Sequence, residues 1–138
     1  MIVVIDTNVF VSGVIRPFSK PAAILRLAAS GAIQMAYDLR LLNEYREVLR
    51  RPKFGLSTDA IEQFLVQIQE EGIPVAATPL SFHLPDPDDE AFLEVALSAR
   101  AAALVTGNKK HFPKRVHGEV RILNPAEFLE LWSTNRPA

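Results

Sequence analysis

The residues of this sequence that could do chemistry are carboxylates next to apolar segments. Asp6 directly follows the run Met1–Ile5, which lacks polar alternation and therefore predicts a strand buried on both faces. In open parallel sheets, ligands bind just beyond the carboxyl ends of the strands. Glu44 borders the apolar stripe of an expected helix, Leu39–Arg50, where an unpaired carboxylate is costly. Two simpler interpretations stay open: Asp6 caps a turn, and Glu44 pairs with a nearby arginine.

A second acidic group, Asp86–Glu90, opens an expected helix that reaches Arg100. Asp86 suits the N-cap, and acidic residues in a first turn complement the helix dipole. Asp89 differs, because it stands three residues before Phe92 and in register with the apolar residues that follow. Helical periodicity therefore predicts that Asp89 lies over the buried face of the helix. An acid that only complemented the helix dipole would lie on the exposed face.

The turn Thr106-Gly107-Asn108 ends another expected strand. It is an ordinary turn by itself, but it offers oxygen atoms at the same sheet edge as Asp6. Converging carboxylates repel one another unless a cation or protons join them. No histidine or cysteine with ligand spacing accompanies these residues, and oxygen ligands favour Mg²⁺ or Mn²⁺. Such sites commonly act on phosphate groups.

The elements that must position these residues alternate between short strands and helices. The expected strands are Met1–Ile5, Ile33–Tyr37, Ile73–Ala77, Ala102–Thr106 and Val120–Leu123. The expected helices are Ala22–Ser30, Leu39–Arg50, Thr58–Gly72, Asp86–Arg100 and Asn124–Trp132. Short strands alternating with helices predict a three-layer α/β/α sandwich around a parallel sheet. The length of 138 residues suits one domain, 1–138.

Composition excludes several classes of protein. Without cysteine, the chain has no disulfide, thiolate zinc site or cysteine nucleophile. The net charge of −1 does not by itself indicate a nucleic-acid partner. An acidic residue at position 6 interrupts any signal-peptide core, and no apolar run is long enough for a membrane span, so we expect a cytoplasmic protein. His83, His111 and His117 lack ligand spacing, and we expect them in loops or at the surface.

Taken in order, these motifs resemble the PIN domain, a compact metal-dependent nuclease family. The resemblance rests on Val4-Ile5-Asp6-Thr7-Asn8, on Glu44 in a helix, on Asp86-Pro87-Asp88-Asp89-Glu90-Ala91-Phe92-Leu93, and on Leu104-Val105-Thr106-Gly107-Asn108-Lys109-Lys110. It covers nearly the whole chain in order and spacing. The sequence looks most similar to the bacterial and archaeal branch related to VapC toxins.

The resemblance implies a five-stranded parallel α/β/α sandwich and one or two Mg²⁺ or Mn²⁺ ions that activate water to attack an RNA phosphodiester. It assigns the acidic metal ligands to Asp6, Glu44 and Asp89. Asp86 would support them or hold a second metal, and Asn108 would bind metal through its amide oxygen. The residues that orient carboxylates or water would be Thr7, Asn8 and Thr106. It also implies a homodimer and an antitoxin protein that blocks the cleft.

Asn108 departs from the family, which often carries aspartate at this position. An amide brings no charge, so a second metal would bind more weakly. A catalytically weak or inactive PIN scaffold that binds RNA or a protein is therefore the main alternative. A phosphotransfer domain is a more distant one, because Asn8 and the residues after the third expected strand lack the acids that it needs.

Basic residues follow the acidic motifs in sequence. Between Thr106 and Arg121 the chain carries five lysines or arginines against Glu119 alone. Arg50 and Arg51 lie at the end of the helix that holds Glu44. Cations on the rim of an acidic pocket suit a phosphate backbone, although solvated loops often carry such clusters. The expected RNA-binding residues are Lys109, Lys110, Arg50 and Arg51.

Overall fold

The fold, taken from a computed structural model that describes residues 1–135, is built on one mixed sheet. The strands are β1 (Ile2–Ile5), β2 (Gln34–Tyr37), β3 (Ile73–Pro74), β4 (Ala103–Val105), β5 (Val116–His117) and β6 (Val120–Leu123). Their order is β3-β2-β1-β4-β6-β5. All neighbours are parallel except β5 and β6. The five predicted strands are thus confirmed as parallel, and β5 adds an antiparallel edge that the sequence analysis did not predict.

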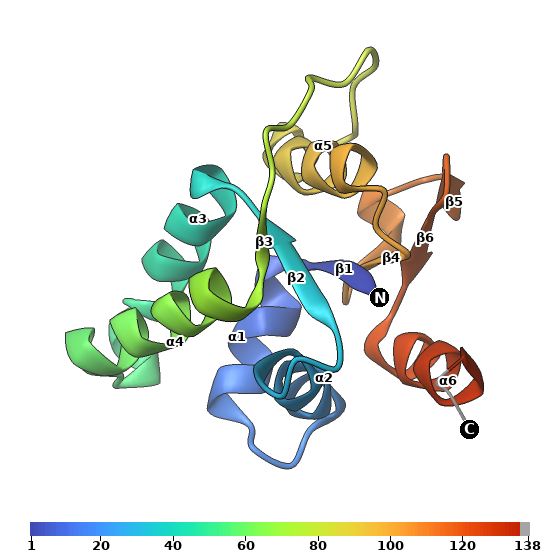
Figure 1. Cartoon of the computed structure of the whole chain (residues 1–138). Coiled ribbons are helices and arrows are strands. Elements are labelled where there is room, and N and C mark those ends of the chain that lie inside the picture. The colour runs from blue at the N-terminus through green and yellow to red at the C-terminus, as the bar shows by residue number, and fades with distance from the viewer. Residues whose placement is uncertain (136–138) are drawn as a thin grey trace.

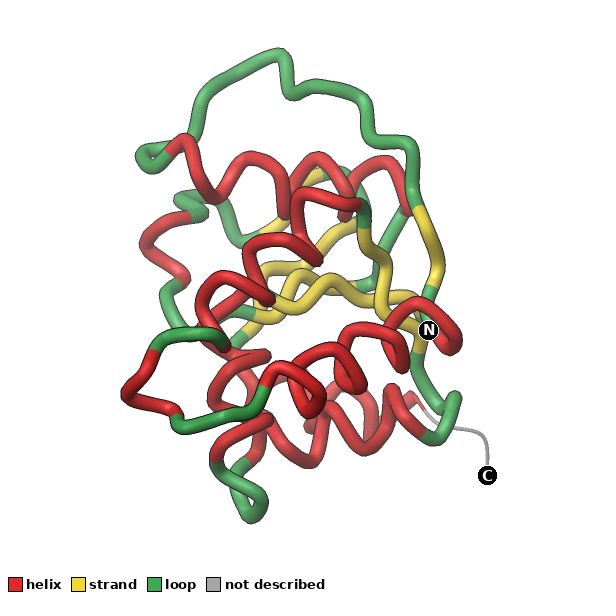
Figure 2. Tube along the Cα trace, turned by 90° about the vertical axis from the view of Figure 1, so that its left-hand side faces the viewer, coloured by secondary structure: helices red, strands yellow, loops and turns green. Residues whose placement is uncertain are grey.

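Helices flank the sheet. The α-helices are α1 (Thr7–Ile15), α2 (Lys20–Ala29), α3 (Leu39–Leu49), α4 (Thr58–Glu71), α5 (Glu90–Ala99) and α6 (Pro125–Asn135). Three short 3₁₀ helices are η1 (Pro52–Phe54), η2 (Pro87–Asp89) and η3 (Lys109–His111). Figure 1 shows α5 on one side of the sheet and α1, α2 and α6 on the other. Helix α3 packs beside α1, and α4 packs against α2 and α3. In Figure 2 the strands lie between helical layers, which confirms the three-layer sandwich.

No helix in the described part of the chain has the length and apolar character needed to cross a membrane.

The centre of the sheet explains where the site forms. The fully buried residues Val3, Val4 and Ile5 occupy β1, as a strand covered by helices on both faces requires. From β1 the chain first builds outward through β2 and β3, then returns to place β4 on the other side of β1. Ligands of such sheets bind where the strand order reverses, at the carboxyl ends. Here that point is the end of β1 and β4.

Helix α1 is the main correction to the expected elements. The sequence pattern predicts no helix over Thr7–Ile15 and is compatible with Asp6 capping a turn. Asp6 is instead the N-cap of α1, and its side chain accepts a hydrogen bond from the Thr7 amide. Helix α1 contains Gly13 and several β-branched residues, which have weak helix propensity. Burial against α2 and α3 stabilises the helix, and single-residue preferences do not report that packing.

Gly72 provides a test of the packing between β2 and the end of α4. A Cβ atom at this position would collide with the backbone carbonyl oxygens of Met35 and Ile68. We expect Gly72→Ala to lower the free energy of unfolding by about 1–3 kcal/mol, because backbone must shift to make room. Urea denaturation measures this change. Gly107→Ala is the control, since its Cβ would meet only the Asn8 side chain at 3.4 Å or more. Equal stability of the two variants would contradict the steric argument.

Candidate metal centre

Asp6 lies where β1 and β4 end side by side. Ile5 and Val105 are paired in register, so Asp6 and Thr106 leave neighbouring strands together. The Thr106 hydroxyl donates to Asp6 Oδ2 at 2.7 Å, and the Thr7 amide donates to Oδ1 at 2.8 Å. Asp6 is only 7% exposed, and burial raises the pKa of its carboxyl despite these hydrogen bonds. The charged carboxylate is therefore held in place at a cost in solvation.

Glu44 joins this end of the sheet through α1. The Thr7 hydroxyl donates to Glu44 Oε2 at 2.7 Å, which links α1 to α3. Arg40, one of the nearby arginines, binds Asp38 and Glu94 instead. Partial burial raises the pKa of Glu44, and the charge of Asp6 raises it further. Glu44 therefore faces the other carboxylates, as its position beside the apolar stripe predicts.

Asp86, Asp89 and His111 form the tightest group of potential ligands. Within residues 1–135, one ligand atom from each lies within 4.8 Å of the others. Asp89 Oδ2 is buried and lies 2.8 Å from His111 Nδ1, but it accepts no hydrogen bond. Burial, followed by the charge of Asp6, raises the pKa of Asp89 to about 6. Asp6 lies outside this group of three and acts on Asp89 through its charge, whereas the charge of Glu44 is coupled to those of Asp6 and Asp88.

Asn8 and Asn108 connect the turns around these acids. The Asn108 amide donates to the Thr106 hydroxyl oxygen at 3.1 Å, and its side-chain nitrogen lies 2.9 Å from His111 Nε2. The Asn8 side-chain oxygen accepts a longer hydrogen bond, 3.5 Å, from the Gly107 amide. Among the described residues Gly107 has no positive φ, so the turn is not left-handed. Asn8 therefore links the turn after β4 to the start of α1, and Asn108 links that turn to η3.

Two residues near the acids were not recognised from the sequence. The expectation that His111 is an uninvolved loop residue is wrong, because the 3₁₀ helix η3 directs it to Asp89. Its spacing of three residues from Asn108 was the available signal, since one 3₁₀ turn brings such residues to the same side. Tyr45 looked like a core residue, and it is fully buried. Its hydroxyl also donates to the Ile5 carbonyl, which fixes the strand end before Asp6.

The predicted RNA-binding cations have different surroundings. Lys109 pairs with Glu127 at 2.8 Å, and Arg50 lies 3.9 Å from Glu62. Arg51 lines an open groove beside Glu44, between α3 and the start of α5. Lys110 is exposed on η3, next to His111. Arg51 and Lys110 are therefore better placed near the acids to meet a phosphate than the two paired cations are.

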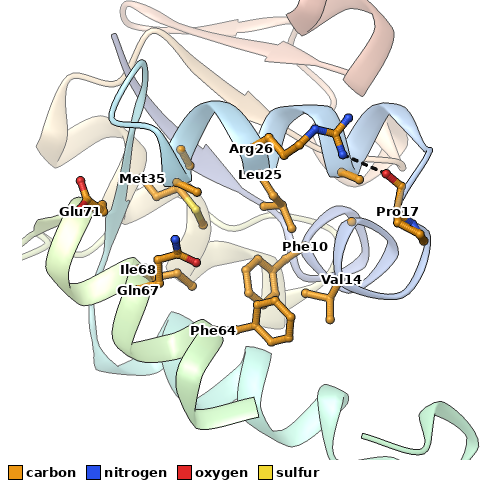
Figure 3. A pocket seen from close by; sticks show the side chains of 15 residues that line it. Phe10, Val14, Pro17, Leu25, Arg26, Met35, Phe64, Gln67, Ile68 and Glu71 are labelled. Carbon is orange, nitrogen blue, oxygen red and sulfur yellow. Dashed lines mark hydrogen bonds between the residues drawn. The ribbon is translucent and has the colours of Figure 1, made fainter. Parts of the chain in front are cut away.

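An apolar cavity of about 260 Å³ lies elsewhere, between α1, α2 and α4. Figure 3 shows Phe10, Val14, Leu25 and Phe64 around it, with Arg26 bonded to the Pro17 carbonyl at its rim. Neither Asp6 nor Asp89 lines this cavity. A search based on apolar volume alone would therefore miss the acids, whose chemistry defines the candidate site.

Substitution of Thr106 tests how much the hydrogen bonds around Asp6 contribute to the stability of the protein. The Thr106 side chain is fully buried, and Thr106→Val would remove the donor to Asp6 and the acceptor for the Asn108 amide. We expect a loss of about 1–3 kcal/mol in the free energy of unfolding, since buried polar groups would lose their partners. Urea denaturation at neutral pH measures it. Thr106→Ser keeps the hydroxyl and is expected to restore most of the loss, so equal losses in both variants would contradict this role.

The residues fit a divalent cation. Four carboxylates gather at one sheet edge with few compensating cations, and a buried oxygen of Asp89 accepts no hydrogen bond. Burial is the main cause that raises these pKa values, and repulsion between the charges adds to it. An ion would offset both effects and would satisfy that oxygen.

Comparison with known proteins agrees with the fold. VapBC2 from Rickettsia felis, solved bound to a DNA fragment from their promoter, has a chain that superposes with a TM-score of 0.61 and 18% identity. A chain of FitAcB from Neisseria gonorrhoeae superposes with a TM-score of 0.60 and 18% sequence identity. Each alignment covers 90% of this chain and 98% of the other. Comparison with curated proteins found no match for this chain. The family described as PIN domain matches residues 2–110, and this chain therefore belongs to the PIN domain family.

Proposed function

We propose that the protein is a metal-dependent ribonuclease that hydrolyses RNA phosphodiester bonds. The observation that carries this proposal is the convergence of Asp6, Glu44, Asp86 and Asp89 where β1 and β4 end, with one buried Asp89 oxygen lacking a hydrogen bond. Such a group of acids is unfavourable without a cation and is suited to binding one. Membership of the PIN domain family supports the nuclease class.

One or two Mg²⁺ or Mn²⁺ ions would be held by Asp6, Glu44, Asp86 and Asp89, with Asn108 as a further oxygen ligand. When bound, such ions lower the pKa of water and neutralise charge that develops on a phosphate.

The protein's own residues hold the acids in position for this chemistry. Thr106 and the Thr7 amide fix the two oxygens of Asp6, and the Thr7 hydroxyl orients Glu44. Asn8 links the turn after β4 to α1 through a hydrogen bond from the Gly107 amide. Lys110 and Arg51 are exposed near the acids and would position the RNA backbone by charge. Lys109 and Arg50 would contribute only after leaving their carboxylate partners.

The biological role that we propose is the toxin component of a toxin–antitoxin pair, acting in the cytoplasm as a homodimer. The sequence resembles VapC-related toxins, and the structural neighbours come from the complexes named VapBC2 and FitAcB. An antitoxin protein would then be the regulatory partner.

Purified protein incubated with single-stranded RNA tests the proposal. We expect cleavage with Mn²⁺ or Mg²⁺ and none with excess EDTA. Glu44→Gln is expected to lower the cleavage rate about tenfold or more, since a metal ligand would be lost. Glu47→Gln is the matched control, because Glu47 is exposed on the same helix. Cleavage that persists in EDTA, or equal rates in both variants, would refute a metal-dependent nuclease.

The second candidate is a PIN scaffold that binds RNA or a protein partner without turnover. The observation that favours it is the side chain of Asn108, which brings no charge and is engaged with His111. In that case RNA binding would persist in EDTA, and no metal would produce cleavage at any concentration.

A further inference from the structure

His111 is the nitrogen donor closest to the acids. It ends η3, five residues after Thr106, whose hydroxyl donates to Asp6. Its Nδ1 atom lies 2.8 Å from Asp89 Oδ2, and Asp86 completes a group whose ligand atoms lie within 4.8 Å of one another. The all-oxygen site expected from the sequence therefore has an imidazole at its edge.

Asp89 supplies an independent sign that this group takes a ligand. The residue is 9% exposed, and its Oδ2 atom lies 2.8 Å from His111 Nδ1 without the alignment of a hydrogen bond. A buried carboxylate oxygen without a donor is costly, and native structures rarely retain one without a reason. A cation between Asp86, Asp89 and His111 would satisfy this oxygen.

Asn108 controls which ring nitrogen faces the acids. Its side-chain amide lies 2.9 Å from His111 Nε2, so Nδ1 is the atom presented to Asp89. The oxygen and nitrogen of an amide can exchange places by a half-turn. With its oxygen towards Nε2, Asn108 would accept the ring N–H and leave a lone pair on Nδ1. Histidine ligands of metals commonly bind in this way, with the second nitrogen hydrogen-bonded.

We propose that His111 is a nitrogen ligand of the divalent cation held by Asp86 and Asp89, and that it makes this site prefer Mn²⁺ over Mg²⁺. This inference rests on the proposed metal-dependent function, but it concerns only how the ion is bound. Imidazole suits transition metals, whereas Mg²⁺ is bound mainly by oxygen. The asparagine at position 108 then acts as a positioning residue for His111 and need not replace the charge of an aspartate.

The test is Mn²⁺ binding to the whole protein without RNA. Pulsed electron paramagnetic resonance of bound Mn²⁺ is expected to show coupling to an imidazole nitrogen in the wild-type protein. His111→Ala is expected to lose this coupling, to weaken Mn²⁺ binding about tenfold or more, and to reduce the ratio of Mn²⁺ to Mg²⁺ affinity measured by calorimetry. His83→Ala is the matched control, since the His83 side chain is 93% exposed and pairs with Glu90. It should keep the coupling and both affinities.

Bound Mn²⁺ without nitrogen coupling in the wild-type protein, or no Mn²⁺ binding at all, would overturn the proposal. So would an equal loss of Mn²⁺ and Mg²⁺ affinity in His111→Ala. These outcomes are separate from the nuclease test. RNA cleavage with Mn²⁺ that lacks nitrogen coupling would refute only the role of His111. Nitrogen-bound Mn²⁺ in a protein that does not cleave RNA would support that role and refute only the proposed nuclease activity.

Discussion

Replacing Asp6 by asparagine is expected to lower metal-dependent RNA cleavage at least about 100-fold without destabilising the metal-free protein. The loss of rate follows because a bound metal contributes several kcal/mol to such reactions, and each 1.36 kcal/mol is a factor of ten. Stability should be retained or raised, because burial makes the Asp6 charge unfavourable. Asparagine keeps an oxygen for the Thr7 amide and offers a donor to the Thr106 hydroxyl oxygen.

Two measurements on the same preparation separate these effects. Cleavage of a labelled RNA gives the rate, and thermal unfolding with and without Mn²⁺ gives stability and metal binding. Asp59→Asn is the control, because Asp59 is an exposed acid at the start of α4, in a different part of the chain. We expect Asp59→Asn to match the wild-type protein in cleavage rate and in thermal unfolding with and without Mn²⁺. An Asp6→Asn variant that unfolds more easily without metal would contradict the electrostatic argument, and one that retains activity would exclude Asp6 as a ligand.

Periodicity in the sequence was enough to place most of the acids. Asp6 could be located because the buried run before it can only be a central strand, and Asp89 because its spacing from Phe92 turns it inward. The same reasoning placed Glu44 at the edge of its helix's apolar face. Each of these positions is set within a single strand or helix, and the hydrophobic periodicity of a sequence predicts single strands and helices well.

Features that depend on contacts between elements could not be predicted in this way. Helix α1 is stabilised by packing against α2 and α3, which outweighs the weak helix propensity of its β-branched residues. His111 approaches Asp89 only because the turn after β4 and the start of α5 meet at the same sheet edge. A search for ligand spacing along the chain cannot detect a pair that is 22 positions apart by number and carried by different elements.

The arrangement of charges also explains why the net charge of −1 was uninformative about nucleic acid. Several arginines and lysines are neutralised locally, as Arg46 is by Glu62 and Lys109 by Glu127. Within residues 1–135, Asp6, Glu44 and Asp89 pair with no lysine or arginine, and burial raises the pKa of all three. A divalent ion would reverse the local charge there, which the sum over the whole chain cannot show.

The stabilisation by Mn²⁺ is expected to depend on pH. The pKa of Asp89 is raised from 3.8 to about 6 in the folded protein. Without metal, the folded state therefore binds the proton more tightly than the unfolded state does. The resulting contribution to stability is fully present below pH 3.8 and is lost as the pH rises through about 6. A cation needs the deprotonated carboxylate, so Mn²⁺ binding should change in the opposite direction.

The difference in melting temperature with and without Mn²⁺ isolates this effect, because carboxylates away from the site titrate equally in both samples. We expect a shift of roughly 5–10 °C at about pH 7.5, with Mn²⁺ at about 100 times its Kd. At about pH 5 we expect about half of that shift, because protonation of Asp89 weakens Mn²⁺ binding about tenfold. Asp89→Asn should remove most of the shift at the higher pH. A shift of the same size at both pH values would contradict the assignment, because the proton and the ion would then not compete for Asp89.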